Sequence, residues 1–341
     1  MRTLCFGEML LRLSPADHLR IEQASAFDAR YGGAEANVAL SLALQGDDAA
    51  YLSVIPANRI GDCAVRSLAM WGVDTSRVIR SGDRLGVYFM EFGASERPNA
   101  VVYDRKYSAI AGVKPGDIDW DKVFDGAAWF HWTGITPALS DSAAEVTLEA
   151  CKAAKAKGLT ISCDLNYRKK LWTREKAKKV MTELCSYVDV MIANEEDSKD
   201  VFGIEAEGTD IETGKLSEAG YRDLAKKLAA AFGAKKVAFT LRESFSANDN
   251  NWSALLYDAA SDTAIRSRQY AIRIVDRVGG GDSFGGGLIY SLMNGYSDEE
   301  AINFAAAASA LKHTIEGDFN RVTLDEVEKL MGGSASGRVQ R

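Results

Sequence analysis

The feature that most constrains the fold of this chain is a glycine-rich segment at residues 276–287, which reads Asp-Arg-Val-Gly-Gly-Gly-Asp-Ser-Phe-Gly-Gly-Gly. Gly279, Gly280 and Gly281 have no Cβ, so their backbone N–H groups can converge on one phosphate oxygen at the positive end of the helix that follows. Asp282 would then face the acceptor of that phosphate. The segment predicts phosphoryl transfer to a hydroxyl, with Asp282 accepting the proton. The alternative is a flexible turn in which Asp282 only caps the helix.

Spacing excludes two other phosphate-binding motifs in this segment. Gly281 and Gly286 have the spacing of a P-loop, but the lysine that such a loop requires does not follow them. A dinucleotide-binding fingerprint would need a glycine where Phe284 stands, and it would open the first strand–helix turn rather than lie late in the chain. Neither motif therefore explains the segment.

Composition and charge limit the classes of partner. The chain has 341 residues, 47% of them hydrophobic, which is enough for one large α/β domain or two smaller ones. Its net charge is −7 and it has no long basic run, which argues against nucleic acid or an anionic membrane as the main partner. The amino terminus is too charged for a signal peptide and no apolar run reaches membrane-spanning length, so we expect a cytoplasmic protein.

The cysteines and histidines indicate neither disulfides nor a metal centre. The five cysteines are odd in number, have no Cys-x-x-Cys spacing and lie mostly in apolar segments, so we expect reduced, buried thiols. The three histidines lie far apart in the sequence, whereas metal ligands usually include close pairs.

From about residue 127 onward, short β-rich runs alternate with amphipathic runs of helical length. This alternation predicts βαβ units, a mainly parallel sheet with helices on both faces, and ligands at the carboxyl ends of the strands. We expect strands near 129–132, 159–165, 188–193 and 236–240, and helices near 141–157, 173–185 and 217–232 and after residues 281 and 297.

Residues 86–105 interrupt this alternation. Two strand-like runs separated only by a short polar stretch predict a β-hairpin there. Together with extended segments near residues 10–25, the hairpin could form a small sheet outside the main one and close over a site that must exclude water. The alternative is that the hairpin extends the main sheet, because periodicity does not show which sheet a strand joins. The tail at residues 332–341 is expected to be disordered.

A second motif lies near the start of the chain, at residues 32–40, and reads Gly-Gly-Ala-Glu-Ala-Asn-Val-Ala-Leu. Together with the segment at 276–284 it resembles the Gly-Gly-x3-Asn-x-Ala and Asp-Thr-x-Gly-Ala-Gly-Asp-x-Phe patterns of the ribokinase-like (PfkB) family of sugar kinases. The resemblance implies one domain over residues 1–331, with a parallel-sheet core and a β-sheet lid from about 10–30 and 86–112. It also implies ATP with Mg²⁺, transfer to a primary hydroxyl and a homo-oligomer, and leaves open whether a monovalent cation takes part.

Three further segments are similar to the branch of this family that phosphorylates 2-keto-3-deoxygluconate. They are residues 7–15, 103–105 and 164–172. This similarity implies transfer to the 6-hydroxyl of 2-dehydro-3-deoxy-D-gluconate, and a carboxylate substrate would need a cation such as a guanidinium. A kinase for a neutral sugar such as fructose or ribose, and a sugar-binding regulator without turnover, are the alternatives.

The resemblance places six residues on the sugar acid: Gly33, Tyr88, Tyr103, Arg105, Arg168 and Asp318. Each of the side chains also has a structural alternative. The tyrosines could pack within the hairpin, Arg105 could be a solvated charge at a strand end, Arg168 could join Lys169 and Lys170 in a surface cluster, and Asp318 could be a turn residue.

The nucleotide side departs from the family pattern. The usual Thr-x-Gly-x-x-Gly segment has lost both glycines here, where the chain reads Thr240-Leu241-Arg242. We assign these three residues, with Asn166, Gly279 and Gly281, to ATP. Asn194 and Asp197 resemble an Asn-x-x-Glu segment associated with magnesium through water, and a helix N-cap is the alternative. Asn37 is expected to anchor its helix or steady the preceding glycine turn rather than bind a ligand, and nothing in the sequence explains Arg277 in place of the usual threonine.

Overall fold

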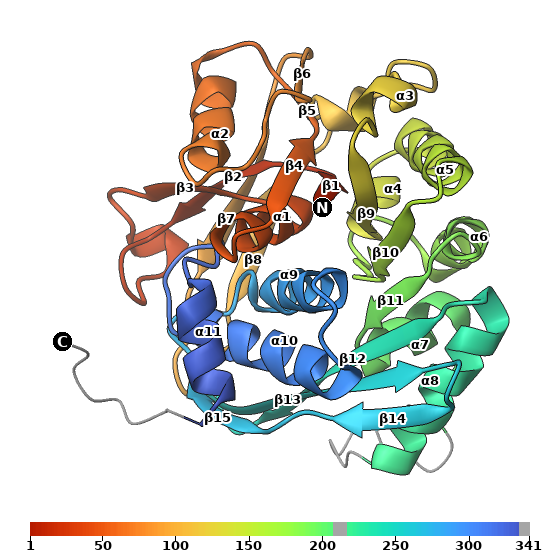
Figure 1. Cartoon of the computed structure of the whole chain (residues 1–341). Coiled ribbons are helices and arrows are strands. Elements are labelled where there is room, and N and C mark those ends of the chain that lie inside the picture. The colour runs from red at the N-terminus through yellow and green to blue at the C-terminus, as the bar shows by residue number, and fades with distance from the viewer. Residues whose placement is uncertain (207–216, 334–341) are drawn as a thin grey trace.

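The computed structural model describes residues 1–206 and 217–333, and the predicted tail lies outside this part from residue 334 onward. The main element is a nine-stranded sheet (Figure 1). Its strands follow in the order β14 (Thr263–Arg266), β13 (Asp249–Asp258), β12 (Lys236–Ser244), β11 (Val190–Ala193), β10 (Thr160–Asp164), β9 (Ala127–Thr133), β1 (Arg2–Phe6) and β4 (Asp48–Leu52), with β15 (Tyr270–Arg273) paired to β13. In this sheet β4, β1, β9, β10, β11 and β12 run parallel to one another. β13 pairs antiparallel with β12, and β14 and β15 pair antiparallel with β13.

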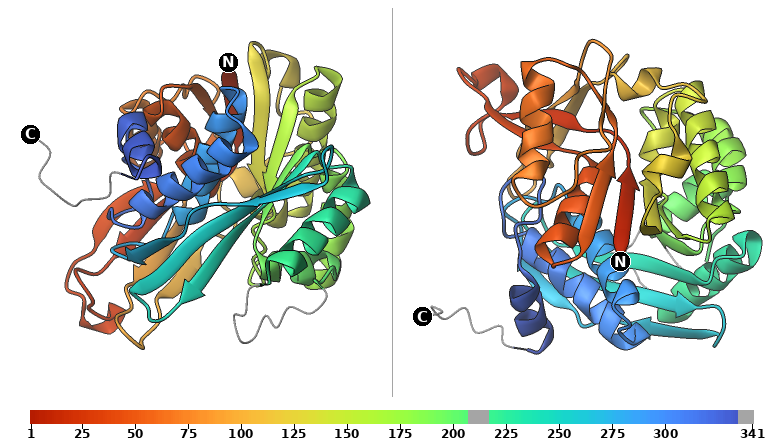
Figure 2. Two further views of the ribbon diagram at one scale, coloured as in Figure 1. Left: turned by 60° about the horizontal axis from the view of Figure 1, so that its bottom comes forward. Right: turned by 45° about the horizontal axis from the view of Figure 1, so that its top comes forward.

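Helices cover both faces of this sheet, as the alternation predicted (Figure 2). Along β1, Leu4 and Phe6 pack into the core on one side and Cys5 into the core on the other, so the strand is apolar on both faces. The first core includes side chains of α3 (Trp120–Val123), α4 (Ile135–Ala138), α5 (Asp141–Ala156), α6 (Arg174–Cys185), α7 (Glu195–Phe202) and α8 (Glu218–Phe232). The second includes those of α1 (Ala34–Leu44), α2 (Arg59–Ala69), α9 (Gly280–Met293), α10 (Asp298–Lys312) and α11 (Leu324–Met331).

Hydroxyl N-caps fix the starts of four of the predicted helices. Ser140, Thr173, Ser217 and Ser297 each accept a hydrogen bond from the backbone N–H three residues later. The helices expected at 141–157, 173–185 and 217–232 and after 297 are confirmed, and the helix expected after 281 is α9, which begins at Gly280 without a side-chain cap. All five cysteines are free and four are buried, as expected. Among the described residues, no helix has both the length and the apolar character needed to cross a bilayer.

The strand expected at 236–240 is longer in the structure. β12 runs to Ser244 because β13 pairs with it in antiparallel register from Lys236 opposite Asp258 to Ser244 opposite Asn250. Thr240 therefore lies inside a strand and not at its end. The side chains of the next two residues point to opposite faces of the sheet, so Leu241 is buried in the core and Arg242 is exposed.

The hairpin belongs to a separate sheet, so the alternative that it extends the main sheet is wrong. This second sheet has the order β3 (Asp28–Gly32), β2 (Leu10–Ser14), β7 (Gly86–Glu91) and β8 (Ala100–Asp104), with β7 and β8 antiparallel. It stands beside the main sheet near the start of α9 (Figures 1 and 2). Short elements complete the fold, namely β5 (Val54–Ile55) paired with β6 (Ile79–Arg80) and the 3-10 helices at Ile21–Gln23 and Ile110–Gly112.

Arg12 ties the second sheet to the glycine-rich segment. This residue of β2 is 1% exposed, and its Nη2 and Nη1 donate to Asp276 Oδ2 and Asp318 Oδ1 at 2.8 Å each. Both carboxylates are buried as well. Charges removed from water are tolerated only when they are paired, so this network fixes β2 relative to the start of α9.

Substitution of Arg12 tests this attachment. Arg12→Met would leave two buried carboxylates without their guanidinium, and we expect it to lower the free energy of unfolding by about 3–5 kcal/mol. Arg30, its cross-strand neighbour on β3, pairs with the exposed Glu316, and Arg30→Met should cost less than about 1 kcal/mol. Denaturant unfolding measures both variants, and equal losses would contradict the role given to Arg12.

Candidate active site

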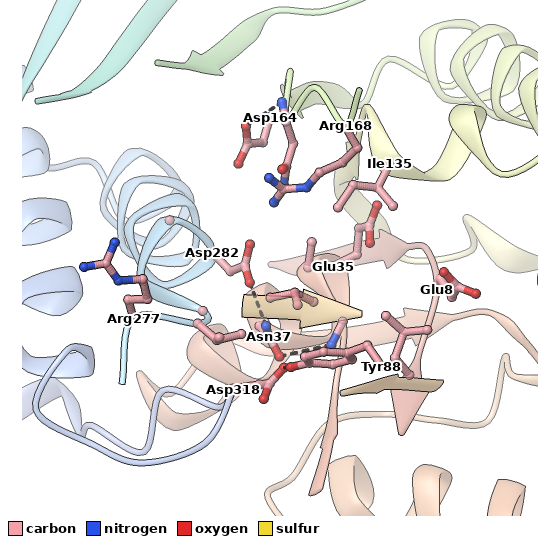
Figure 3. A pocket seen from close by; sticks show the side chains of 18 of the residues that line it. Glu8, Glu35, Asn37, Tyr88, Ile135, Asp164, Arg168, Arg277, Asp282 and Asp318 are labelled. Carbon is pink, nitrogen blue, oxygen red and sulfur yellow. Dashed lines mark hydrogen bonds between the residues drawn. The ribbon is translucent and has the colours of Figure 1, made fainter. Parts of the chain in front are cut away.

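A cavity of about 420 Å³ lies between the carboxyl edge of the main sheet and the second sheet (Figure 3). Its size and its place at the strand ends are typical of a small-molecule site in an α/β fold. The predicted site residues that line it are Gly33, Tyr88, Tyr103, Arg105, Asn166, Arg168, Asn194, Asp197, Thr240, Arg242, Gly279, Gly281, Asp282 and Asp318. Gly280 and Leu241 do not line it, because Gly280 is buried under the turn and Leu241 faces the core.

The glycine-rich turn presents the bare N-terminus of α9 to the cavity. Gly279 has a left-handed φ of 81°, and a Cβ there would lie 2.0 Å from the carbonyl oxygen of Asp318. A Cβ on Gly280 would lie 2.5 Å from the His313 ring, whereas one on Gly281 would meet nothing within 4 Å. The first two glycines therefore allow close packing below the turn, and Gly281 leaves the positive helix end open to an anion.

Asp282 sits in the first turn of α9 and faces α1 across the cavity. Asn37 donates from Nδ2 to Asp282 Oδ2 at 2.6 Å, and its Oδ1 accepts from the backbone N–H of Gly33 at 3.3 Å (Figure 3). Asn37 thus steadies the glycine turn as expected, and it also orients Asp282, which the sequence did not indicate. Burial raises the pKa of Asp282 to about 6, while the bond from Asn37 and the charge of Arg168 act in the opposite direction.

The second sheet contributes a tyrosine–aspartate pair to the cavity. The Tyr88 hydroxyl donates to Asp318 Oδ2, whose other oxygen accepts from Arg12. Tyr103 lies opposite Tyr88 on β8, with ring centroids 5.8 Å apart. The tyrosines therefore pack within the hairpin and also line the cavity, and Asp318 is a buried, bonded carboxylate rather than an exposed turn residue.

Arg105 is held by an acid that sequence reasoning missed. Its Nε donates to Glu8 Oε2 at 2.7 Å, its Nη2 donates to the same oxygen, and Ser108 Oγ donates to Glu8 Oε1 at 2.6 Å. Arg105 and Glu8 are both buried and both line the cavity. The interpretation of Arg105 as a solvated strand-end charge is therefore wrong, because the pair is fixed inside the protein.

Arg168 approaches the cavity from the loop after β10, whose last residue is Asp164 (Figure 3). Asp197 of α7 also lines the cavity. Burial and the charge of Asp197 raise the pKa of Asp164 well above its usual value. Burial raises the pKa of Asp197 to about 7, against the opposing effect of Arg168. Among the described residues Arg168 forms no ion pair, so its charge remains available to a ligand.

Asn194 caps α7, since its Oδ1 accepts from the backbone N–H of Asp197 at 2.8 Å, and the capping alternative is confirmed. The described part of the chain contains no group of three or more acidic, histidine or cysteine side chains arranged to hold a metal. Magnesium in phosphate-transfer sites takes most of its oxygens from phosphates and water, so one or two carboxylates suffice. Asp164 and Asp197 are near enough to interact and line the cavity, which fits such an ion.

Two arginines stand near the glycine-rich turn, where Arg242 and Arg277 both line the cavity. Burial, and after it the charge of Arg242, lowers the pKa of Arg277. Arg277 Nη2 donates to the carbonyl oxygen of Ala247 at 2.8 Å, which orients the side chain. Asn166 also lines the cavity and has a left-handed φ of 39°, a conformation that asparagine tolerates better than most residues. The arginine in place of the usual threonine therefore adds a positive charge near the turn.

Comparisons with known proteins agree on one family. Residues 2–320 match the model of the pfkB family of carbohydrate kinases. A 2-dehydro-3-deoxygalactonokinase from Haloferax volcanii is 35% identical over 97% of each chain, and a 2-dehydro-3-deoxygluconokinase from Bacillus subtilis is 30% identical over 92% of this chain and 90% of its own. The crystal structure of a 2-dehydro-3-deoxygluconokinase from Thermotoga maritima superposes with a TM-score of 0.94, at 49% identity over 98% of this chain and all of its own.

Removal of the Asn37 amide tests the environment of Asp282. The donor favours the charged carboxylate, so Asn37→Ala should raise the pKa of Asp282. The protonated form accepts no proton from a substrate, and the acid limb of kcat/KM, expected near pH 6, should move to higher pH. Ser41→Ala, on the same helix and bonded only to the Asn37 carbonyl, is the control. An unchanged acid limb in Asn37→Ala would contradict the assignment of that limb to Asp282.

Proposed function

Because this chain belongs to the pfkB family of carbohydrate kinases, we propose that it transfers the γ-phosphoryl group of ATP to the 6-hydroxyl of 2-dehydro-3-deoxy-D-gluconate. The observation that carries the proposal is the placement of Asp282 beside the open N-terminus of α9, in one cavity with unpaired Arg168. A base, an anion-binding helix end and a guanidinium that acts on the same base lie close together there, which suits a phosphoryl acceptor that is itself an acid. The 49% identity to the Thermotoga maritima 2-dehydro-3-deoxygluconokinase supports the same sugar.

Asp282 acts as the base in this reaction. It takes the proton from O6 as that oxygen forms its bond to the γ-phosphorus, and the bond from this phosphorus to the β–γ bridging oxygen breaks to release ADP. Its pKa of about 6 leaves it mostly ionised at neutral pH and still basic enough to accept the proton. The backbone N–H groups of Gly279 and Gly281, which line the cavity, hold the γ-phosphate, whereas the N–H of Gly280 donates to the Arg277 carbonyl oxygen.

The nucleotide end is built from charges rather than from the glycines usual in this family. Arg242 and Arg277 face the triphosphate, with Thr240 and Asn166 beside it. Magnesium would neutralise the phosphates when bound, held through water by Asp197 next to Asn194. Leu241 contributes only its backbone, because its side chain is in the core.

The two arginines assigned to the sugar acid differ in whether they form an ion pair within the protein. Arg105 is already compensated by Glu8, so it serves mainly as a rigid donor over the Tyr103 ring, which lies 5.2 Å from its guanidinium. Arg168 forms no ion pair within the described residues, although its charge acts on Asp164, Asp197 and Asp282, and it pairs with the substrate carboxylate. Gly33, Tyr88 and Asp318 contact the hydroxyls, and only glycine fits at position 33, because a Cβ there would lie 2.0 Å from the Glu8 carbonyl oxygen.

The galactonate epimer is the second candidate substrate. It is favoured by the 35% identity to the Haloferax volcanii galactonokinase over nearly the whole chain. The two sugar acids share the carboxylate, the keto group and the 6-hydroxyl, so the same mechanism serves both. A neutral sugar would offer no carboxylate to the Arg168 guanidinium and is less favourable.

A substrate panel tests the reaction itself. We expect ATP-dependent release of ADP with 2-keto-3-deoxygluconate, less with the galactonate epimer, and little with gluconate, fructose or ribose. Asp282→Asn should lower kcat by about a thousandfold while the circular dichroism spectrum stays unchanged, because the general base is lost. Near-normal turnover in this variant would exclude Asp282 as the base, and a preference for fructose or ribose would exclude the sugar acid.

A charge-neutral variant tests recognition of the carboxylate. Arg168→Met should raise KM for the sugar acid by about 10–100-fold, the cost of a lost hydrogen bond to a charged group, and should change KM for a weakly used neutral sugar far less. Lys169→Met removes a neighbouring exposed charge that lines no part of the cavity and serves as the matched control. If both variants raise KM equally, the effect is general electrostatics and not a specific contact.

A further inference from the structure

Behind the glycine-rich turn lies a lysine that the reaction described above does not use. Lys312 is the last residue of α10, and its side chain is 0% exposed. A Cβ on Gly279 would lie 3.3 Å from Lys312 Cε, so the aliphatic chain passes directly beneath the turn. Its charge is therefore placed behind the backbone that holds the γ-phosphate in the proposed reaction.

The ammonium is held by uncharged oxygens. Lys312 Nζ donates to the carbonyl oxygens of Asp276 at 3.3 Å and Ile315 at 3.1 Å. Within the described residues, no carboxylate oxygen lies within ion-pair distance of it. Backbone carbonyl oxygens arranged around a cation are the ligands by which proteins bind K⁺. Lys312 thus occupies a site made of backbone carbonyl oxygens. Through them it links the segment before α9, at Asp276, to the turn after α10, at Ile315.

The charges around this site balance only with Lys312 present. Asp276 and Asp318 share the single guanidinium of Arg12, and Asp276 accepts further bonds from the backbone N–H groups of Val278 and Gly317. Two buried carboxylates therefore face one arginine and one lysine. Burial lowers the pKa of Lys312, and the charges of Asp276 and Asp318 act in the opposite direction. Without the ammonium the cluster would carry a net negative charge just below the phosphate site.

We propose that Lys312 is a positioning residue whose ammonium is the resident monovalent cation of the phosphate-binding turn. It fixes the backbone at residues 276–279 and supplies a permanent positive charge behind the γ-phosphate. The protein consequently needs no exchangeable K⁺ or NH₄⁺ for turnover. This inference rests on the proposed kinase reaction for its activity readouts.

The wild-type protein provides the first test. Turnover is measured in tetramethylammonium, K⁺ and NH₄⁺ salts at one ionic strength, since tetramethylammonium is too large for a carbonyl site. We expect less than about a twofold difference between the salts, because the site is already filled. Stimulation by K⁺ or NH₄⁺ of about tenfold or more would overturn the proposal.

The second test removes the charge and keeps the length of the side chain. Lys312→Met should lower kcat by about tenfold or more, since a fixed charge near the transferred phosphoryl group is lost, and K⁺ or NH₄⁺ should restore part of it. Lys236→Met is the matched control, because Lys236 pairs with Asp258 and Asp298 and lines no part of the cavity. It should show neither the loss nor the salt response.

The outcomes separate a positioning role from a structural one. A folded Lys312→Met with wild-type kcat, or with a loss that no monovalent cation restores, would overturn the proposal. If this variant does not fold, the salt series on the wild-type protein decides the question. A wild-type protein that binds ATP but phosphorylates no sugar would refute only the proposed function. The ATP affinity of wild type and Lys312→Met in the same salts, measured by calorimetry, would then decide the role of Lys312.

Discussion

The structure depends on a buried charge network centred on Arg12. It joins the second sheet, the glycine-rich turn and the segment after α10 through Asp276 and Asp318. These parts lie far apart in the sequence, and the buried charges can only be satisfied when all three are in place. The distance between the second sheet and the glycine-rich turn is therefore set by electrostatics as well as by packing. Gly279 makes this possible, because only glycine allows the Asp318 carbonyl to approach the turn.

Local patterns in the sequence were enough to predict the main elements. The glycine-rich turn, the hydroxyl caps and the hairpin each depend on residues that are neighbours in the chain, so their signals are present in short segments. The length of β12 could not be predicted, because it is set by pairing with β13. The ion pairs of Glu8 and Arg12 and the contact of Asn37 with Asp282 were missed for the same reason. Each of these residues looks like an ordinary polar position in sequence, and only its distant partner in the fold gives it a role.

Charge is distributed unevenly along the cavity in a protein whose net charge is −7. The phosphate end combines the positive terminus of α9 with Arg242 and Arg277, while at the sugar end Glu8 cancels the charge of Arg105. Three further carboxylates, Asp164, Asp197 and Asp282, have raised pKa values because they share this partly desolvated space. Their mutual repulsion falls when cations accompany the nucleotide. Binding of the metal–nucleotide complex and ionisation of the base are therefore expected to favour each other.

The same network also bears on the choice between the two epimeric sugar acids. Epimers differ in the direction of one hydroxyl, and a site rejects the wrong one strongly only if a fixed polar group would be left unpaired. Asp318 is such a group, because one oxygen is held by Arg12 and the other by Tyr88. A carboxylate that cannot rotate offers its remaining lone pairs in a single direction. Stability and stereochemical preference are thus coupled through Arg12, since loosening Asp318 to accept a second epimer would also loosen the attachment of the second sheet.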